Sequence, residues 1–450
     1  MRSNPRRTRL ATALLLACVA TASAAAPAQD DAALDLKADE PEKPAAKRPT
    51  GPDDAGALGL QSDDSEKRPA TSSQTKLFVE GAAGYADRRY GLGAREVSRA
   101  AIDLRTSFPL SPSVRGTFSG RIDVTQPAEP RLDGPIASVR EAYLGWQNEA
   151  ATQVVDIGRI NVRQGPGYGY NPTDFFRDHA LRTLTTADPF QLRENRMGSV
   201  MLRAQRLWTG GSVEVVYSPE LAASRSTKGV SFDLGSTNAR DRGMVVLNSR
   251  WSETLNSQLS LYREAGTPMR LGVSGTALLS QSLVAHGELA SSRETSLLSR
   301  ALGRPGARRT DQRVVAGLTY TTPFQLSLTV EYEGNGFAVA RANSRAIQQA
   351  GPQVWSAYYL HALSLQETAS RHAALLYATQ RDLGLKNLDL TVILRANVTD
   401  KSRMTWIDLK YRLDKLDLAL QYQHNGGPLG TEFGSAINRQ LTSIVATLYF

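Results

Sequence analysis

The stretch Leu-Asp-Leu-Thr-Val-Ile-Leu-Arg-Ala-Asn, residues 388–397, alternates apolar and polar side chains almost without a break. Successive side chains of a β-strand point to opposite faces of the sheet. One face of this strand would therefore carry the leucines and Val392, and the opposite face would carry Arg395. The stretch predicts a strand with one apolar and one charged face.

The same alternation appears in residues 113–124, where Val114, Phe118 and Ile122 are separated by Arg115 and Arg121. Similar short runs, bounded by Gly, Pro, Asn, Asp and Ser, recur from residue 76 to the end of the chain. This spacing is typical of consecutive antiparallel strands. A soluble sandwich would turn the apolar face inward, whereas a membrane barrel turns it outward, so the connections between the strands must decide.

The connections alternate in length along the chain. Every second connection is a short turn, and all long segments fall in the remaining positions: 163–196, 220–242, 291–311, 334–370 and 425–438. Short turns on one rim and long loops on the other are characteristic of outer-membrane barrels. We therefore predict an all-β protein, a transmembrane antiparallel β-barrel of about 18 strands. Residues 137–162 lose the alternation, so a bulge near Gly158 or a count of 16 strands stays open.

Hydropathy agrees with this interpretation. The mean hydropathy is -0.33, although 41% of the residues are hydrophobic. Beyond residue 28 no apolar run approaches the roughly 18 residues that a membrane helix needs, which excludes a helical membrane protein. A barrel offers lipid only every second side chain, so its mean hydropathy stays low.

The N-terminal region indicates export. Arginines precede an apolar run at residues 10–20, and small residues with Ala-x-Ala spacing follow, so residues 1–28 are interpreted as a signal peptide. Cys18, the only cysteine, is then either an apolar residue of the discarded signal or a lipidation site. Residues 29–75 are rich in Asp, Ala, Pro and Lys, and we expect a disordered periplasmic segment. The barrel would span residues 76–450.

The last run places Ile444, Leu448 and the terminal Phe450 on one face. This ending is similar to the C-terminal signal of outer-membrane barrels, which implies contact with the barrel-insertion machinery. We expect a cell outer membrane location with both termini in the periplasm. The expected surroundings are outer-membrane lipid and lipopolysaccharide.

Charged residues indicate what the pore could pass. The chain has a net charge of +9, and arginines on the polar strand faces would be tolerated only inside the barrel, away from hydrocarbon. A ring of them would favour anions. The alternative is a structural ladder in which Arg and Asp neutralise one another across strands. The residues expected to line the pore are Arg105, Arg115, Arg121, Arg159, Arg163, Arg395 and Arg412.

The longest motif is Gly-Pro-Gly-Tyr-Gly-Tyr-Asn-Pro-Thr-Asp-Phe-Phe-Arg at residues 165–177. A water-exposed loop has little use for four aromatic rings, so we predict that residues 163–196 fold inward and constrict the pore. The rings could stack on a sugar acid or another anionic, ring-containing solute. The alternative is a loop that only braces the barrel. The expected constriction residues are Tyr168, Tyr170, Asp174, Phe175, Phe176 and Arg177.

Residues 139–146, Val-Arg-Glu-Ala-Tyr-Leu-Gly-Trp, followed by Ile157-Gly158-Arg159 and the Gly-rich run at residues 165–170, resemble alginate-export porins and related large monomeric outer-membrane porins. The resemblance covers about residues 139–177. It implies an arginine-rich lumen that selects an acidic polysaccharide, with Arg159 and Arg163 at the matching positions. The Asn-Pro-Thr-Asp-Phe-Phe run at residues 171–176 departs from the alginate-export pattern.

The sequence contains no motif typical of an enzyme, a metal site or a nucleic-acid-binding protein. There is no phosphate-binding loop, zinc motif or dinucleotide fingerprint, so no cofactor, metal or catalytic residue is expected. Basic residues do not gather on one helix or stripe, so nucleic-acid binding is not expected. The sequence predicts a non-enzymatic porin-like channel for anionic solutes or an acidic or amino-sugar saccharide. Two alternatives stay open: a structural barrel closed by its loops that displays residues 334–370 to a partner, and a hydrolase with its site on the rim.

Overall fold

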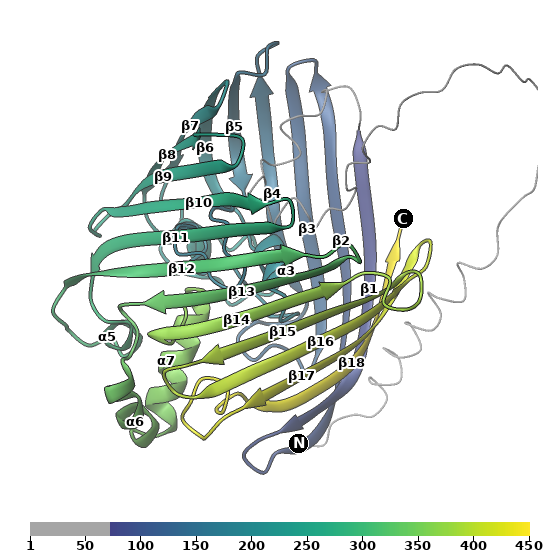
Figure 1. Cartoon of the computed structure of the whole chain (residues 1–450), viewed down its shortest axis with the longest axis vertical. Helices are drawn as coiled ribbons and strands as arrows, with labels where there is room; N and C mark the ends of the chain where they lie inside the picture. Colours follow the sequence, from purple (N-terminus) through teal and green to yellow (C-terminus); the bar gives the residue numbers. More distant parts are fainter. Residues whose placement is uncertain (1–72) are drawn as a thin grey trace, which may run out of the picture. The chain divides into compact units, whose positions relative to one another are not determined.

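The computed structural model describes residues 73–450, so the expected signal peptide and residues 29–72 lie outside the described residues. The sheet has 18 strands and is closed, because β1 pairs with both β2 and β18 (Figure 1). The first nine strands are β1 Gln74–Arg88, β2 Gly93–Ser111, β3 Val114–Gln126, β4 Ile136–Gln147, β5 Gln153–Ile160, β6 Ser199–Trp208, β7 Gly211–Ser218, β8 Arg242–Arg250 and β9 Leu255–Glu264. The others are β10 Arg270–Ser280, β11 Leu283–Glu294, β12 Arg309–Thr321, β13 Leu326–Asn335, β14 His372–Gln380, β15 Leu388–Asn397, β16 Ser402–Arg412, β17 Leu416–Gly426 and β18 Asn438–Tyr449. The predicted count of 18 is confirmed, and 16 is wrong.

The apolar strand faces point away from the barrel interior. Ile102 on β2, Ile157 on β5 and Ile444 on β18 are each more than half exposed, and many large apolar residues on the other strands share this exposure. Their sequence neighbours Asp103 and Asp156 are buried on the inner side. A continuous outward apolar band around a closed sheet fits lipid and not water. The predicted transmembrane barrel is therefore confirmed.

The two rims differ in their connections. The long connections, residues 161–198, 219–241, 295–308, 336–371 and 427–437, all follow odd-numbered strands and so leave the barrel at one rim. Turns such as residues 209–210 and 281–282 connect the strands at the other rim. This is the sorting of loops that the sequence predicted. We call the two ends the long-loop rim and the short-turn rim.

One predicted irregularity lies elsewhere. Gly158 pairs in unbroken register with Tyr143 on β4 and Met201 on β6. The shift occurs between β3 and β4, where Ser119 pairs with Glu141 and the next residue of β3 pairs with Val139. Arg140 is the extra residue of this β-bulge, which lets two successive side chains of β4 serve the inner face. The expected bulge near Gly158 is therefore wrong.

Helices occupy part of the long-loop rim. Helix α5 (Leu297–Ala301), α6 (Arg341–Gln349) and α7 (Pro352–Ser364) share an apolar cluster around Leu297, Trp355 and Tyr358 (Figure 1). Trp355, Tyr358 and Ala362 recur at helical spacing within residues 334–370, which were expected to form a loop. Among the described residues, no helix has both the length and the apolar character needed to span a membrane.

Candidate channel interior

Residues 161–198, between β5 and β6, form the infolded segment, which includes helix α3 (Pro189–Glu194). The segment contacts inward-facing side chains of β9, β11, β13 and β14, far along the sheet from the strands that it connects. Figure 1 shows α3 within the ring of strands. The segment that we expected to turn inward therefore lies against the inner wall. Its role as a constriction remains a prediction.

Glu288 on β11 is the main anchor of the infolded segment. Its carboxylate accepts hydrogen bonds from the backbone N–H of Gly167 (2.8 Å), the Asn171 side-chain amide (3.1 Å) and both the N–H (3.1 Å) and hydroxyl (2.7 Å) of Thr173. A buried carboxylate needs such donors, because an unpaired charge in a dry interior is costly. A Cβ at Gly165 would collide with this carboxylate, which explains a glycine there.

A second carboxylate, Glu331 on β13, holds the next turn of the segment. It accepts hydrogen bonds from the backbone N–H groups of Tyr168 (2.7 Å) and Gly169 (3.1 Å) and contacts Nε2 of His286 on β11 (3.0 Å). A Cβ at Gly169 would overlap with the carboxylate of Glu333 and approach Leu375. The glycines at residues 165–169 thus let backbone and wall carboxylates approach each other closely.

A third anchor is Glu367, which follows α7. Its carboxylate accepts hydrogen bonds from two side chains of the infolded segment, the guanidinium of Arg177 (2.9 Å) and the hydroxyl of Tyr170 (2.5 Å). It also forms an ion pair with Arg313 on β12 (2.8 Å). Burial acts to raise the pKa of Glu367, but Arg313 and Arg177 outweigh it and lower the pKa to about 2. The ionised carboxylate therefore links the long-loop rim, the wall and the infolded segment.

Asp174 forms ion pairs within the infolded segment. Its carboxylate pairs with Arg196 at 2.5 Å and with Arg193 at 3.9 Å, both near the end of the segment. Burial lowers the pKa of Arg196 to about 10, although Asp174 opposes this shift. Arg196 also donates to Gln366 beside α7 (2.6 Å), so the segment is tied to the same rim region as Glu367.

The four aromatic rings of the segment pack against the wall. Tyr168, Tyr170, Phe175 and Phe176 are each at most 5% exposed. Phe175 stacks on Tyr262 of β9 at 5.0 Å, and Tyr168 meets the ring of Phe190 on α3 at 4.8 Å. These rings cannot also stack on a passing solute. The expected ring-stacking site is therefore wrong for this set, and the bracing alternative accounts for its burial.

Part of the barrel interior is apolar, whereas the alternation of apolar and polar side chains predicted a polar inner face. Inward-facing Met201, Val216, Met244 and Val246 form an apolar cluster with Phe175 and Phe176. Strands β6 to β9 thus present apolar residues on both faces where the infolded segment covers them. Burying these surfaces together stabilises the inward position of the segment through the hydrophobic effect.

Three of the seven arginines expected to line the pore face inward on β2 and β3. Arg121 pairs with Glu80 (3.0 Å), Asp123 (3.0 Å) and Asp103 (3.7 Å). Arg105 pairs with Asp103 (3.3 Å) and with Glu194 at the end of α3 (3.2 Å). Arg115 faces the same interior, on the same face of β3 as Arg121. Most of these guanidinium charges are balanced by carboxylates, as the ladder alternative required.

Arg395 and Arg412 also face inward, on β15 and β16. Arg395 pairs with Glu333 of β13 at 2.8 Å, and Arg412 pairs with Asp389 of β15 at 2.8 Å. Arg412 is the more exposed of the two and lies at the short-turn rim. The pairs again cross from strand to strand and neutralise each other.

The prediction that Arg159 lines the pore is wrong. It pairs in register with Ala142 and Val200 and shares the outward face with Ile157, not the inner face. Its guanidinium is covered instead, since it donates to the carbonyl of Val139 (3.3 Å) and the hydroxyl of Thr237 (3.4 Å). Loop 219–241 folds over the end of the short strand β5 and removes Arg159 from the expected pore lining.

Arg163 lies in the infolded segment itself and is partly exposed. Its charge acts on the buried Arg193, and among the described residues it forms no ion pair. Arg163 therefore differs from the paired arginines of the wall. It is the expected pore residue with the least compensated charge.

Glu288 and Glu331 on the wall and Glu367 after α7 hold the infolded segment but were not predicted from the sequence. A signal was present, because Glu331 and Glu333 alternate with Val330 and Tyr332 on β13, and Glu288 lies between apolar residues on β11. Inward-facing glutamates without a nearby cation in sequence indicate a partner supplied from elsewhere in the chain. Within the described residues, no group of three His, Cys, Asp or Glu could hold a metal ion.

Comparisons with known proteins concern the fold. No family model and no curated protein matches the sequence, so the resemblance to alginate-export porins finds no support there. Among solved structures, Acinetobacter baumannii OccAB1 aligns with a TM-score of 0.53 at 12% identity, over 87% of this chain and 99% of that one. Pseudomonas aeruginosa OccK9 (OpdG) and OpdK, the latter crystallised with vanillate, each align with a TM-score of 0.54 at 10% identity, over 84% of this chain and 98% of theirs. At this identity, the similarity to Occ and Opd structures establishes the barrel fold alone.

Proposed function

We propose that this protein is a non-enzymatic, porin-like channel of the outer membrane that passes small anionic organic solutes. The observation that carries the proposal is the infolded segment, which glutamates of the wall hold inside an 18-stranded barrel. A segment held at a fixed position inside the barrel would restrict which solutes can pass. The long loops would face the outside and both termini the periplasm, as is general for such barrels.

The proposed solute class rests on charge and on the inward position of the infolded segment. Arg163 on the infolded segment is partly exposed and forms no ion pair with a described residue, so it offers positive potential at the segment. Acidic solutes would therefore be favoured over neutral ones. The solved structure of OpdK contains vanillate, a small aromatic carboxylate, which supports the same class here. The packed segment favours small solutes over a polysaccharide chain.

Reconstitution tests the proposal. The purified barrel is inserted into planar bilayers for single-channel conductance, and into liposomes for swelling with vanillate, glucuronate or uncharged glucose. We expect open channels with anion preference and faster entry of the two carboxylates than of glucose. A matched variant replaces residues 166–192 with a short Gly-Ser linker, and its conductance should rise while its preference falls.

The second candidate is a structural barrel closed by its loops, which the extensive internal pairing of Arg121 and Glu367 favours. It predicts no conductance in the intact barrel and conductance only after the infolded segment is removed. That result, obtained with correctly folded protein, would replace the channel proposal.

A further inference from the structure

The outward face of half the barrel has an unusual charge pattern. Arg439, at the β-bulge of β18, is exposed and pairs with Asp87 of β1 at 4.0 Å. Apart from it, the only charged side chains on the outward faces of strands β9 to β18, as the structure describes them, are Arg263, Arg293 and Arg403; no Asp or Glu occurs there. All three are exposed, and none forms an ion pair with a described residue. The charges of the interior, by contrast, are mostly paired.

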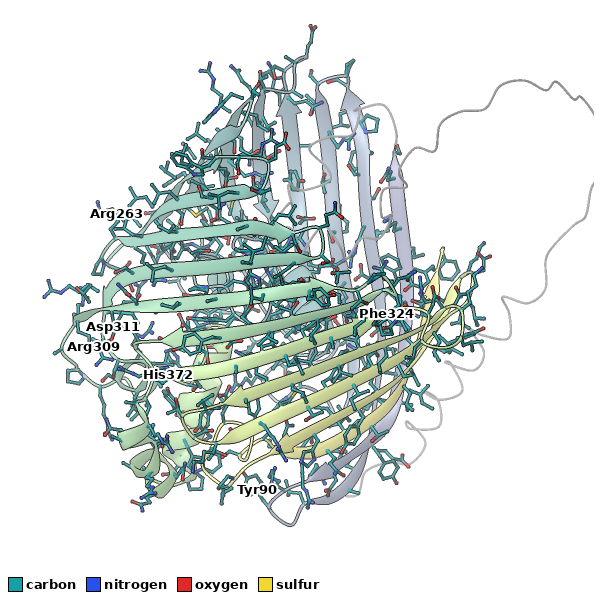
Figure 2. The ribbon with its side chains drawn as sticks, in the orientation of Figure 1. Tyr90, Arg263, Arg309, Asp311, Phe324 and His372 are labelled. Atoms are coloured by element: carbon teal, nitrogen blue, oxygen red, sulfur yellow. The ribbon has the colours of Figure 1, made fainter. Side chains whose placement is uncertain are left out.

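The three arginines also lie at the same end of the barrel. Arg263 is the penultimate residue of β9, Arg293 that of β11, and Arg403 is the second residue of β16. Each position adjoins a connection that leaves the long-loop rim. Figure 2 shows Arg263 at one end of the strands and Phe324, from a short turn, at the other.

The outward apolar band begins directly beside these arginines. Leu261 follows Arg263 on the outward face of β9, and Leu289 lies on that of β11, both well exposed. An arginine in mid-membrane costs about 2 to 4 kcal/mol, but at the interface the cost falls to about 0 to 1. A guanidinium just above the hydrocarbon is therefore placed at the level of lipid head groups.

We propose that Arg263, Arg293 and Arg403 form a binding surface for the phosphate groups of lipopolysaccharide in the outer leaflet. A guanidinium binds phosphate through two parallel hydrogen bonds, and no outward carboxylate of β9 to β18 competes for it. Asp87 and Glu96, the outward acids near the same rim, lie on β1 and β2 instead. Lipopolysaccharide supplies both anionic phosphates and acyl chains for the adjoining apolar band. This inference rests on the outer-membrane location proposed above.

Lipopolysaccharide retained by the detergent-extracted barrel tests this surface. The triple variant Arg263→Gln, Arg293→Gln, Arg403→Gln is compared with wild type by phosphate analysis and mass spectrometry of the co-purified lipid. Arg206→Gln is the matched control, since Arg206 is an exposed outward arginine near the short-turn rim. We expect the triple variant to retain at least about five-fold less lipopolysaccharide per barrel. The control should retain the wild-type amount, and single-channel conductance should stay unchanged in both.

A second arm separates phosphate recognition from general lipid adhesion. Wild-type barrel stripped of lipid is offered native or enzymatically dephosphorylated lipopolysaccharide, and only the native form should depend on the three arginines. Equal retention by wild type and triple variant, or an equal loss with Arg206→Gln, overturns the inference. A barrel that does not fractionate with the outer membrane overturns the proposed location instead, so the two failures are distinguishable.

Discussion

Glu288 accepts hydrogen bonds from both the backbone nitrogen (3.1 Å) and the hydroxyl (2.7 Å) of Thr173, 115 residues earlier in the chain. The two residues lie on β11 and on the infolded segment, so this pairing connects the wall to the segment that lies against it. Because the carboxylate also accepts hydrogen bonds from the backbone N–H of Gly167 and the side-chain amide of Asn171, one side chain satisfies several buried donors. Its removal should therefore act on the position of the whole segment.

Glu288→Ala is expected to release the infolded segment. The change leaves the backbone N–H of Gly167 and both donors of Thr173 without an acceptor, at about 1 to 3 kcal/mol for each buried donor that stays unpaired. The Asn171 amide keeps its hydrogen bond to the carbonyl of Gly167 (2.6 Å). In planar bilayers the variant should show larger and noisier single-channel conductance than wild type. Thr319→Val is the matched control, because it removes a buried inward hydrogen bond to Thr329 (2.8 Å) without contact to the segment. Steady wild-type conductance in Glu288→Ala would contradict the anchoring role.

Gly169→Ala tests the close approach of backbone and wall. The new Cβ would overlap with Glu333 and lie 3.0 Å from a methyl group of Leu375, so the segment or β13 must shift. We expect a lower thermal midpoint, on the order of 1 to 3 kcal/mol of destabilisation, as for other overpacked sites. Gly243→Ala serves as control, because a Cβ there meets only a backbone oxygen at 3.9 Å. Equal midpoints for the two variants would show that the glycine is not needed for packing.

The barrel could be predicted from sequence because its information is local. Alternation in stretches such as residues 388–397 reports the two faces of a strand directly, and the order of short and long connections reports the rims. Arg140 shows the limit of this reasoning. A bulge depends on how two strands pair, so the alternation revealed an irregularity in residues 137–162 but not its position.

The interior was harder to predict because its contacts are long-range. The inward turn of residues 163–196 followed from four aromatic rings, but their burial depends on partners such as Tyr262, 87 residues beyond Phe175. Arg159 was expected in the pore as an arginine on a polar strand face, but the loop that covers it cannot be predicted from the sequence of β5 alone. Composition likewise gave no sign that Glu367 follows a helix and reaches Arg177.

Anion preference is expected to depend on Arg163 and not on Arg159. Arg163 has no ion pair with a described residue, so its loss removes a charge that no carboxylate balances. Arg159 lies on the outward face under loop 219–241 and is separated from the interior by the sheet. In a salt gradient, the reversal potential of Arg163→Ala should move toward that of a non-selective pore, and that of Arg159→Ala should match wild type. The opposite ranking would return Arg159 to the pore lining.

Stability should fall as pH rises from about 4.5 to about 7 because of Glu432, in the connection between β17 and β18. Burial and then nearby Asp400 raise the pKa of Glu432 to about 7 from an ordinary value near 4.5, although Arg395 opposes the shift. Between these two pH values the folded protein holds a proton that the unfolded chain has lost, so the free energy of unfolding decreases with rising pH and levels off above pH 7.

Thermal midpoints from pH 4.5 to 8 should decline in wild type and decline less in Glu432→Gln, which cannot ionise. Glu149→Gln, at an exposed short turn, should keep the wild-type slope. An identical slope in all three proteins would exclude Glu432 as the titrating group.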